Sequence, residues 1–400
     1  MKILAIRTHW HPVNTPGSRR FESFLTHLVK THDVTLLSLE HPKQAGDIRP
    51  DENIKYKNIH IKVPSFFYIT LYQRIAVKLR GILPQLDRFF SFGGRLLNKG
   101  IETCTRSKYD MIITTYQPVS SLWVASRLSK KIGLPWICDL RDLPNQFLPK
   151  GQFNKESLYL KKIISNSCGV TCATEGLENR LKDEYARDDA KTIYNGIPGD
   201  WLKAIQKESG ISHNKTFDIV YAGSLYAGRS LDILLKAIEL LPLTISEKKL
   251  INVRVFGSVK SSTINNYLEN YKHKVSFEGI IEQKNLKDWY QKSSILVNLM
   301  PEGHSAAIPS KIFEYAASGV QILNISPEES FVSKFISNSQ LGITTNSVSE
   351  CSEWLLSLFK NWEISGNMTI NYNAPEDLMF FTREKQAAAF QNYIEDKLKR

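Results

Sequence analysis

The sequence predicts an α/β protein with two doubly wound domains. Short apolar runs of strand length alternate with helical stretches along its 400 residues, and this alternation is typical of parallel sheets covered by helices. The alternation stops in a polar stretch, Lys203 to Lys215, and then begins again. A chain of this length with 42% hydrophobic residues is also large enough to build two separate cores.

The predicted strands form two successive series. The first comprises Ile3–Arg7, Val34–Leu39, Met111–Thr115, Trp136–Leu140, Gly169–Ala173 and Thr192–Tyr194. The second comprises Phe217–Ala222, Val253–Phe256, Val275–Glu278, Ile295–Leu299, Val320–Ile325 and Gly342–Thr345. We therefore expect one domain over residues 1–205 and a second over residues 206–375, followed by a helix over residues 376–400.

The composition excludes several classes of protein. The five cysteines are scattered without paired spacing, which favours a reduced, cytoplasmic chain over a disulfide scaffold or a zinc module. The apolar run from Met1 to Arg7 is too short for a signal peptide and suits a buried first strand. No later segment has transmembrane length.

A basic, aromatic segment lies between residues 61 and 108. Its nine basic residues outnumber its two acidic ones, and this excess is a large part of the net charge of +12. The basic residues are Lys62, Arg74, Lys78, Arg80, Arg88, Arg95, Lys99, Arg106 and Lys108, and the acidic ones are Asp87 and Glu102. Apolar residues at Leu71, Ile75, Leu79 and Ile82 recur at helical spacing. The pattern favours a helix that binds an anionic membrane surface. A helix packed on its own sheet is the alternative, and no nucleic-acid-binding motif accompanies the charge.

The segment from Pro309 to Gly319 predicts a helix whose N-terminus binds an anion. Pro309 suits the first helical position, and Gly319 suits a left-handed helix end. A lysine in the first turn, Lys311, opposes the helix dipole unless an anion binds in front of it. Glu314 lies one turn further on, where its carboxylate can accept hydrogen bonds from hydroxyl groups. The pair suggests a sugar phosphate site, with an ordinary surface helix as the alternative.

Glycine and charged residues follow several of the predicted strands. Doubly wound sheets bind ligands beyond the carboxyl ends of their strands, so these loops are candidate site elements. In the first domain they carry Gly17 and the Asp139-Leu140-Arg141-Asp142 sequence. In the second they carry Gly223-Ser224, Arg229 and Gly257-Ser258.

In their order along the chain, these motifs resemble the family 4 retaining glycosyltransferases of GT-B architecture. The matching motifs are the Gly17 loop, Tyr194-Asn195-Gly196-Ile197, Tyr221-Ala222-Gly223-Ser224, Phe277-Glu278-Gly279, Pro309 to Tyr315, and Phe381-Thr382-Arg383-Glu384-Lys385. The loop from Asp139 to Asp142 resembles a subgroup that builds bacterial surface polysaccharides. The resemblance implies two Rossmann-like domains facing a cleft, an N-terminal one for the acceptor and a C-terminal one for a nucleotide sugar.

The resemblance also implies roles for individual residues. Glu314 would bind the nucleotide ribose, Lys311 and Arg229 would hold the diphosphate, and Gly17 would let the first-domain loop approach the phosphates. The implied donor-binding set is Gly17, Gly223, Ser224, Arg229, Gly257, Ser258, His304, Ser305, Ala306, Ala307, Ser310, Lys311, Ile312 and Glu314. The implied catalytic set is Arg229, Lys311, Asp139, Arg141 and Asp142. Fixed positive groups stabilise a leaving diphosphate, so no metal or other cofactor is expected, and the sequence has no Asp-x-Asp pair.

One position departs from the family pattern. The family often carries a second glutamate eight residues before the one at Glu314, and Ala306 stands there. His304, Ser305 and the backbone of Ala306 and Ala307 are the local candidates for contact with the transferred sugar. In the first domain, Asp139, Arg141 and Asp142 are expected to contact acceptor or sugar, although Arg141 and Asp142 could instead form a loop salt bridge.

Three functions fit these residues. The first is transfer of a sugar from a nucleotide diphosphate, with a UDP-sugar favoured, to a glycan or lipid-linked acceptor at the inner face of a bacterial membrane. The second is a nucleotide-sugar epimerase or phosphorylase of the same fold. The third is a catalytically silent binding subunit that lost its first glutamate. The sequence does not determine the base, the sugar, the linkage or the oligomeric state.

Overall fold

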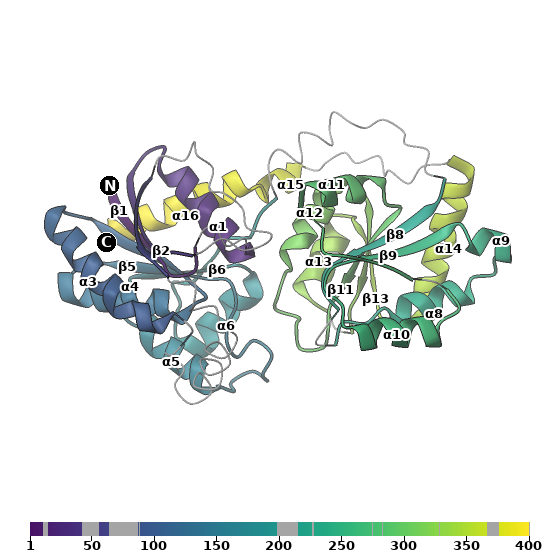
Figure 1. The fold of residues 1–400 in the computed structure, drawn as a ribbon, viewed down its shortest axis with the longest axis horizontal. Coiled ribbons are helices and arrows are strands. Elements are labelled where there is room, and N and C mark those ends of the chain that lie inside the picture. The colour runs from purple at the N-terminus through teal and green to yellow at the C-terminus, as the bar shows by residue number, and fades with distance from the viewer. Residues whose placement is uncertain are drawn as a thin grey trace. The chain divides into compact units, whose positions relative to one another are not determined.

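The computed structural model of the chain describes residues 1–10, 15–41, 56–63, 87, 89–197, 215–225, 228–273, 275–281, 283–327, 329–365 and 376–399. The chain forms two compact units (Figure 1). The N-terminal unit comprises Met1–Asn195 together with Arg383–Arg400, and the C-terminal unit comprises Gly196–Thr382. None of the helices in the described ranges combines the length and apolar character needed to cross a bilayer.

The N-terminal unit contains a parallel sheet in the order β3-β2-β1-β4-β5-β6-β7. Its strands are β1 Lys2–Arg7, β2 Asp33–Glu40, β3 Lys57–Lys62, β4 Met111–Tyr116, β5 Trp136–Leu140, β6 Gly169–Cys172 and β7 Lys191–Thr192. Ile3 pairs with Val34 of β2 on one side and with Met111 of β4 on the other. The strands at the centre are buried on both faces, as expected of a parallel sheet covered by helices.

Helices cover both faces of this sheet (Figure 1). They are α1 Pro16–Leu28, α3 Phe90–Arg106, α4 Val119–Ile132, α5 Lys155–Ile164, α6 Glu175–Tyr185 and α16 Arg383–Leu398. Alternate residues of β1 face opposite cores: Leu4 and Ile6 join the core under α3 to α6, whereas Ile3 and Ala5 join the core under α1 and α16. Phe24 and Phe390 stack at 4.2 Å between ring centroids, so the last helix completes the N-terminal unit.

The C-terminal unit repeats the architecture with the strand order β10-β9-β8-β11-β12-β13. Its strands are β8 Phe217–Ala222, β9 Ile251–Phe256, β10 Val275–Gly279, β11 Ile295–Leu299, β12 Gln321–Ile325 and β13 Gly342–Thr345. Its helices are α8 Asp232–Leu240, α9 Ile245–Lys248, α10 Ser261–Asn270, α11 Gln283–Lys292, α12 Ser310–Ser318, α13 Phe331–Asn338, α14 Val348–Ser365 and α15 Glu376–Phe380. Phe217, Phe359 and Trp362 pack together in one of its hydrophobic cores.

In each sheet the strand order reverses once. The reversal lies between β1 and β4 in the N-terminal unit and between β8 and β11 in the C-terminal unit. Helices on opposite sides of such a point diverge, which leaves a crevice at the carboxyl ends of the two strands. The residues that follow β1, β8 and β11 are therefore the first places to search for a site.

The predicted fold class, two α/β Rossmann-like domains, is confirmed. One strand was not predicted. It is the edge strand β3, whose sequence Lys-Asn-Ile-His-Ile-Lys contains too few apolar residues to form a continuous apolar run. The predicted basic helix at Leu71 to Ile82 lies outside the described residues, as do Arg74, Lys78, Arg80 and Arg88. From the same basic segment, Arg95 and Lys99 belong to α3, and Lys99 pairs with Glu102.

Candidate functional site

The reversal point of the C-terminal unit brings several predicted donor-binding residues together. Gly223 follows β8 directly, and its neighbour strand β11 leads into Pro301. Gly228 adopts a positive φ of 81° and approaches Pro301 so closely that an added Cβ would lie 3.2 Å from the Pro301 Cβ. Arg229, the next residue, is thereby placed at the same end of the sheet as the loop that precedes α12.

Helix α12 begins at Ser310, one residue later than predicted. Pro309 is its N-cap, because its ψ of 137° is extended while its φ of −58° suits a helix. The Ile312 N–H donates to the Pro309 carbonyl at 3.0 Å. Within the described part of the chain, the N–H groups of Ser310 and Lys311 have no protein acceptor. These two donors and the positive end of the helix dipole are the groups that bind an anion at a helix start.

The Lys311 side chain extends from α12 toward the end of β8. Its Nζ lies 4.1 Å from the centroid of the Tyr221 ring and 5.8 Å from that of Tyr315. Burial and repulsion by Arg229 lower the pKa of Lys311 to about 7. Attraction by Glu314 acts in the opposite direction. The residue keeps partial access to solvent, so a ligand can reach it. A negative ligand would restore the proton and the full charge.

The structure holds Lys311 in place through the residue four positions further along α12. The hydroxyl of Tyr315 accepts a hydrogen bond from the Ala222 N–H at 3.0 Å, and the Tyr315 ring packs against Tyr290. This contact joins the first turns of α12 to the carboxyl end of β8. The position of the lysine is therefore set by two buried aromatic residues and by one backbone hydrogen bond.

Two glycines keep the surroundings of Lys311 open. A Cβ at Gly223 would lie 2.8 Å from the Tyr221 hydroxyl oxygen and 3.4 Å from Lys311 Nζ. A Cβ at Gly257 would lie 2.4 Å from the Gly223 carbonyl oxygen. The Ser258 N–H donates to Ser224 Oγ at 3.3 Å. The predicted residues at the ends of β8 and β9 are thus in mutual contact, and no side chain can replace either glycine without moving them.

The remaining predicted donor-binding residues have separate contacts. Glu314 is buried, with 7% of its surface exposed, and interacts electrostatically with Lys311. The Ile312 side chain lies in the core. His304 Nδ1 lies 3.1 Å from the Glu302 carbonyl oxygen. The Ser305 carbonyl accepts from the Phe331 N–H, and the Ala307 N–H donates to the His304 carbonyl, so the residues that flank Ala306 are organised by backbone bonds.

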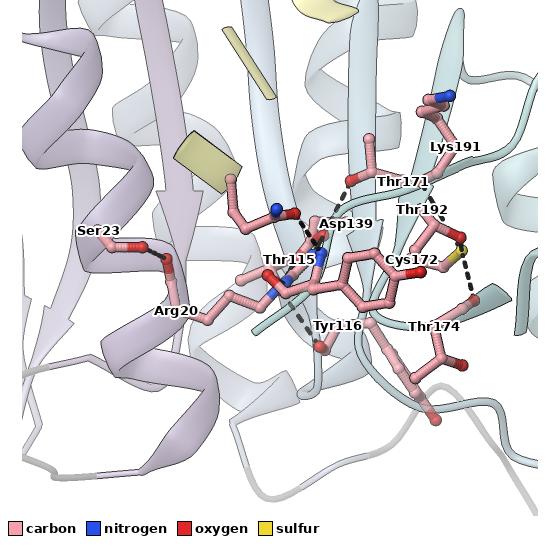
Figure 2. Close-up of polar contacts among 12 residues, drawn as sticks. Arg20, Ser23, Thr115, Tyr116, Asp139, Thr171, Cys172, Thr174, Lys191 and Thr192 are labelled. Carbon is pink, nitrogen blue, oxygen red and sulfur yellow. Dashed lines mark hydrogen bonds and ion pairs between the residues drawn. The ribbon is translucent and has the colours of Figure 1, made fainter. Parts of the chain in front are cut away.

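Asp139 is the centre of a buried network in the N-terminal unit (Figure 2). Arg20 of α1 donates to both of its carboxylate oxygens, at 2.9 and 2.8 Å. The hydroxyl groups of Thr115 and Thr171 donate to the same carboxylate from the neighbouring strands, at 3.2 and 2.8 Å. Arg20 also donates to the Tyr194 carbonyl. The carboxylate of Asp139 is 0% exposed. We therefore interpret Asp139 as a residue that holds α1 and the neighbouring strands together, and not as one that contacts a sugar directly.

Arg141 and Asp142 form the loop salt bridge that we considered as an alternative. Two guanidinium nitrogens of Arg141 donate to Asp142 Oδ2 at 2.9 and 2.7 Å, and both side chains remain partly exposed. Gly17 lies against this pair, since a Cβ there would be 3.3 Å from Arg141 Nη1. The same Cβ would be 3.1 Å from Arg7 Nη2. Arg7 was not among the predicted site residues, although an arginine that ends an apolar strand was a signal for it.

Among the described residues, His, Cys, Asp and Glu side chains nowhere gather in threes at a spacing that could hold a metal ion. The groups that the described structure brings together at the C-terminal reversal point are two cations, one carboxylate and backbone donors. Such a set binds and stabilises a negatively charged oxygen group.

Solved structures with a similar fold cover nearly the whole chain. A sucrose-phosphate synthase from Thermosynechococcus elongatus is 14% identical, with a TM-score of 0.67 over 99% of this chain and 98% of its own. Anabaena HepE, solved with UDP and glucose, is 13% identical, with a TM-score of 0.62 over 99% and 100%. The lipopolysaccharide outer core galactosyltransferase WaaB is 14% identical, with a TM-score of 0.60 over 99% and 100%. The chain has the fold of these GT-B glycosyltransferases.

Identities this low establish the fold alone. A Listeria monocytogenes protein assigned as a UDP-N-acetylglucosamine 2-epimerase also shares it, at 11% identity and a TM-score of 0.58 over 100% of this chain and 96% of its own. No family model matches the sequence, and no curated protein matches it either. The fold is thus compatible with more than one reaction of nucleotide sugars, and the site residues must select among them.

Proposed function

We propose that the protein is a retaining glycosyltransferase that moves a sugar from a nucleotide diphosphate to a glycan or lipid-linked acceptor. The observation that carries the proposal is the convergence of Lys311, Arg229 and the free N–H groups of α12 at the reversal point of the C-terminal unit. The acceptor belongs to bacterial capsule, O-antigen or exopolysaccharide biosynthesis. The C-terminal unit binds the donor, and the N-terminal unit binds the acceptor.

The proposed chemistry follows from charge. When the bond between sugar and diphosphate breaks, negative charge grows on the diphosphate oxygens. Lys311, Arg229 and the start of α12 are fixed before the reaction, so they stabilise this charge more in the transition state than in the ground state. The lowered pKa of Lys311 rises as the diphosphate binds, and the lysine then carries a full positive charge. These groups replace a divalent metal ion, and no cofactor is needed.

A UDP-sugar is the favoured donor. Support comes from the neighbouring HepE structures, which contain UDP with glucose, UDP alone and UDP-glucose. In this assignment Glu314 accepts hydrogen bonds from the ribose hydroxyls, and Gly223 and Gly257 let the backbone approach the phosphates. His304, Ser305 and the backbone of Ala306 and Ala307 contact the transferred sugar, where the family often has a glutamate. The product keeps the anomeric configuration of the donor.

The protein acts in the cytoplasm, on the inner face of the membrane. The basic segment from Phe66 to Lys99 supplies the attraction to anionic lipid, worth roughly 1 kcal/mol for each Lys or Arg near the surface. Changing Arg74, Lys78 and Arg80 to Glu should release the protein from anionic liposomes at low salt and leave nucleotide binding intact. A wild-type protein that fails to sediment with anionic vesicles at low salt would contradict the membrane assignment.

Two other functions remain candidates because each has an observation in its favour. The epimerase-type fold neighbour supports isomerisation of the donor, and Ala306 at the position of a family glutamate supports a silent binding subunit. An activity assay distinguishes the three functions. It uses the nucleotide sugar selected by a thermal-shift screen as the donor, with and without a bacterial lipid extract as the source of acceptor. A glycosyltransferase releases nucleotide diphosphate only with acceptor, an epimerase changes the donor without acceptor, and a silent subunit binds the donor without turnover.

The same assay tests the details. Release of nucleotide diphosphate should persist in the presence of a chelator, and NMR of the product should show the donor's anomeric configuration. Activity that disappears with the chelator and returns with magnesium or manganese would overturn the metal-independent part of the proposal. An inverted anomeric centre would overturn the retaining part.

A further inference from the structure

Arg229 lies in the segment that joins β8 to α8, and the backbone on either side of it is held in place. On one side, Gly228 has a positive φ of 81°, and a Cβ there would lie 3.2 Å from the Pro301 Cβ. On the other side, Ser230 and Leu231 lead directly into α8. The contacts of these two residues therefore help to decide where Arg229 lies.

A single hydroxyl group, that of Tyr267, bonds to both residues that follow Arg229. Tyr267 belongs to α10, and its hydroxyl oxygen accepts a hydrogen bond from the Leu231 N–H at 2.9 Å. The same oxygen lies 3.1 Å from Ser230 Oγ, where either hydroxyl can be the donor. The two helices that this hydroxyl connects, α8 and α10, are both labelled in Figure 1. The chain directly after Arg229 is therefore tied to a second helix.

The Tyr267 side chain is itself fixed. Only 4% of the residue is exposed, and it belongs to the same hydrophobic core as Leu231. Its ring lies near those of Tyr271 and Phe277, with ring centroids 6.0 and 6.3 Å away. Close packing leaves a buried ring little freedom to move. The hydroxyl at its tip is thus a rigid point to which the segment around Arg229 is attached.

The start of α8 depends on this hydroxyl because its own N-cap residue cannot serve. The N-cap is Leu231, whose side chain has no hydrogen-bond acceptor. Ser230 Oγ accepts from the Asp232 N–H at 3.1 Å, and Tyr267 accepts from the Leu231 N–H. Removal of the Tyr267 hydroxyl would take this acceptor from a buried backbone donor, which favours a local rearrangement of the chain next to Arg229.

The charge of Arg229 makes a fixed backbone useful. Arg229 repels Lys311, and this repulsion contributes to the lowered pKa of the lysine. On a backbone that could rearrange, the guanidinium group would move away from the ammonium group and further into water. It would then have to be brought back and ordered when a diphosphate binds, which lowers affinity. An anchored backbone avoids this loss.

We propose that Tyr267 is a positioning residue for donor binding, whose hydroxyl holds Arg229 near Lys311 before the nucleotide diphosphate arrives. The inference rests on the proposed function, in which these two cations bind the diphosphate. Tyr267 acts through the backbone and does not contact the ligand. Because α10 follows the loop of Gly257 and Ser258 at the end of β9, the tyrosine also links the two segments that approach the phosphates in that proposal.

A double-mutant cycle on UDP-glucose affinity tests the proposal. Calorimetry compares wild type, Tyr267→Phe, Arg229→Gln and the double variant. Tyr267→Phe keeps the ring in the core and removes only the hydroxyl, and it should weaken UDP-glucose binding roughly five- to tenfold, the range for one long side chain that must be ordered on binding. In the Arg229→Gln background the same change should leave the affinity unaltered, because no arginine remains to be positioned.

Tyr271→Phe is the matched control. The Tyr271 hydroxyl donates to Asp232 Oδ1 at 2.8 Å, so it also contacts the start of α8, but at a side chain and not at the backbone next to Arg229. This variant should keep the wild-type affinity for UDP-glucose. Ser230→Ala removes the other partner of the Tyr267 hydroxyl, so it should weaken binding in the presence of Arg229 and not in its absence. It carries the test if thermal unfolding shows that Tyr267→Phe is not folded at the titration temperature.

Two results would overturn the proposal. One is an equal loss of affinity on Tyr267→Phe in the wild-type and Arg229→Gln backgrounds, which would show that the hydroxyl serves the fold alone. The other is an unchanged affinity in folded Tyr267→Phe. Failure of the proposed function is separate: the coupling between the two residues would be measured, but no nucleotide diphosphate would be released with the lipid extract. Absence of UDP-glucose binding by wild type would contradict both.

Discussion

The ammonium nitrogen of Lys311 lies 4.1 Å from the centroid of the Tyr221 ring, close to Gly223, the glycine that follows the strand carrying Tyr221. The face of an aromatic ring attracts a cation and partly compensates for the water that the cation loses on burial. This attraction is weaker than the attraction of a carboxylate. The lysine is therefore held in position yet remains short of negative charge. This combination suits a residue whose partner is the substrate.

Replacing Lys311 with Met should separate binding from stability. Loss of a charged hydrogen-bond partner should weaken nucleotide-sugar binding by about 1.5–3 kcal/mol. The free energy of unfolding should rise by about 1 kcal/mol at pH 7, within the range seen when a destabilising functional residue is replaced. The reason is that burial disfavours the charged lysine in the folded state. Calorimetry and thermal unfolding without ligand measure the two effects. Unchanged affinity together with a lower melting temperature would show that the lysine serves only the fold.

Nucleotide-sugar affinity should depend on pH through Lys311. The pKa of the lysine is about 7 in the free protein, and the bound diphosphate raises it. Binding therefore takes up a proton above pH 7, and affinity should fall by up to tenfold per pH unit as the pH rises through 7 to 8.5. UDP-glucose is a suitable probe because its diphosphate keeps its charge over this range. Calorimetry in buffers of different ionisation enthalpy measures the proton uptake.

Lys311→Arg is the matched control for this pH dependence. Arginine stays protonated throughout the range, so the variant should bind UDP-glucose with an affinity that does not change between pH 6.5 and 8.5. A wild-type protein with the same flat profile would contradict the assignment of Lys311 to the diphosphate.

Gly257→Ala should disturb the ends of β8 and β9. The added Cβ would lie 2.4 Å from the Gly223 carbonyl oxygen and 3.0 Å from the Ser224 nitrogen. One of the two strand ends must move, which we expect to lower the free energy of unfolding by about 1–3 kcal/mol. Denaturant unfolding measures this, with Gly94→Ala on α3, where a Cβ meets nothing within 4 Å, as the control. Equal midpoints for the two variants would show that the contact relaxes freely.

Asp139→Asn and Asp142→Asn should have very different effects on stability. Asp139 is buried and accepts two hydrogen bonds from Arg20, so its loss of charge leaves Arg20 unpaired in the core, at roughly 3–5 kcal/mol. The partly exposed pair of Arg141 and Asp142 should be worth about 0–1 kcal/mol. Urea unfolding of both variants gives the comparison. Similar midpoints would mean that the Asp139 network contributes little to the fold.

Sequence patterns predicted the fold well because buried parallel strands are continuous apolar runs. Trp136–Leu140, Phe217–Ala222 and Ile295–Leu299 have the bounds that the apolar runs gave. The edge strand β3 was missed because solvent on its outer side allows lysine, asparagine and histidine. Edge strands bury little, so their composition says little about their structure.

The candidate site was harder to predict because its members come together only through the fold. Lys311 could be singled out locally, since a lysine in a first helical turn conflicts with the helix dipole. Its contact with Tyr221 depends on how α12 packs on β8, which no short motif contains. Arg7 was read as the end of a strand, and its approach to Gly17 and Arg141 follows from the order of β1, β4 and β5 in the sheet.

Titration of a nucleotide sugar into wild type, Glu314→Ala and Glu329→Ala tests the central claim most directly. The ligand is the one that gives the largest thermal shift among UDP-, GDP-, ADP- and dTDP-sugars. Glu314 is buried near Lys311, whereas Glu329 is an exposed surface residue paired with Lys334. We expect Glu314→Ala to weaken binding by about 1.5–3 kcal/mol and Glu329→Ala to leave it unchanged. Absence of binding by wild type, or equal affinity in all three proteins, would contradict a donor site at α12.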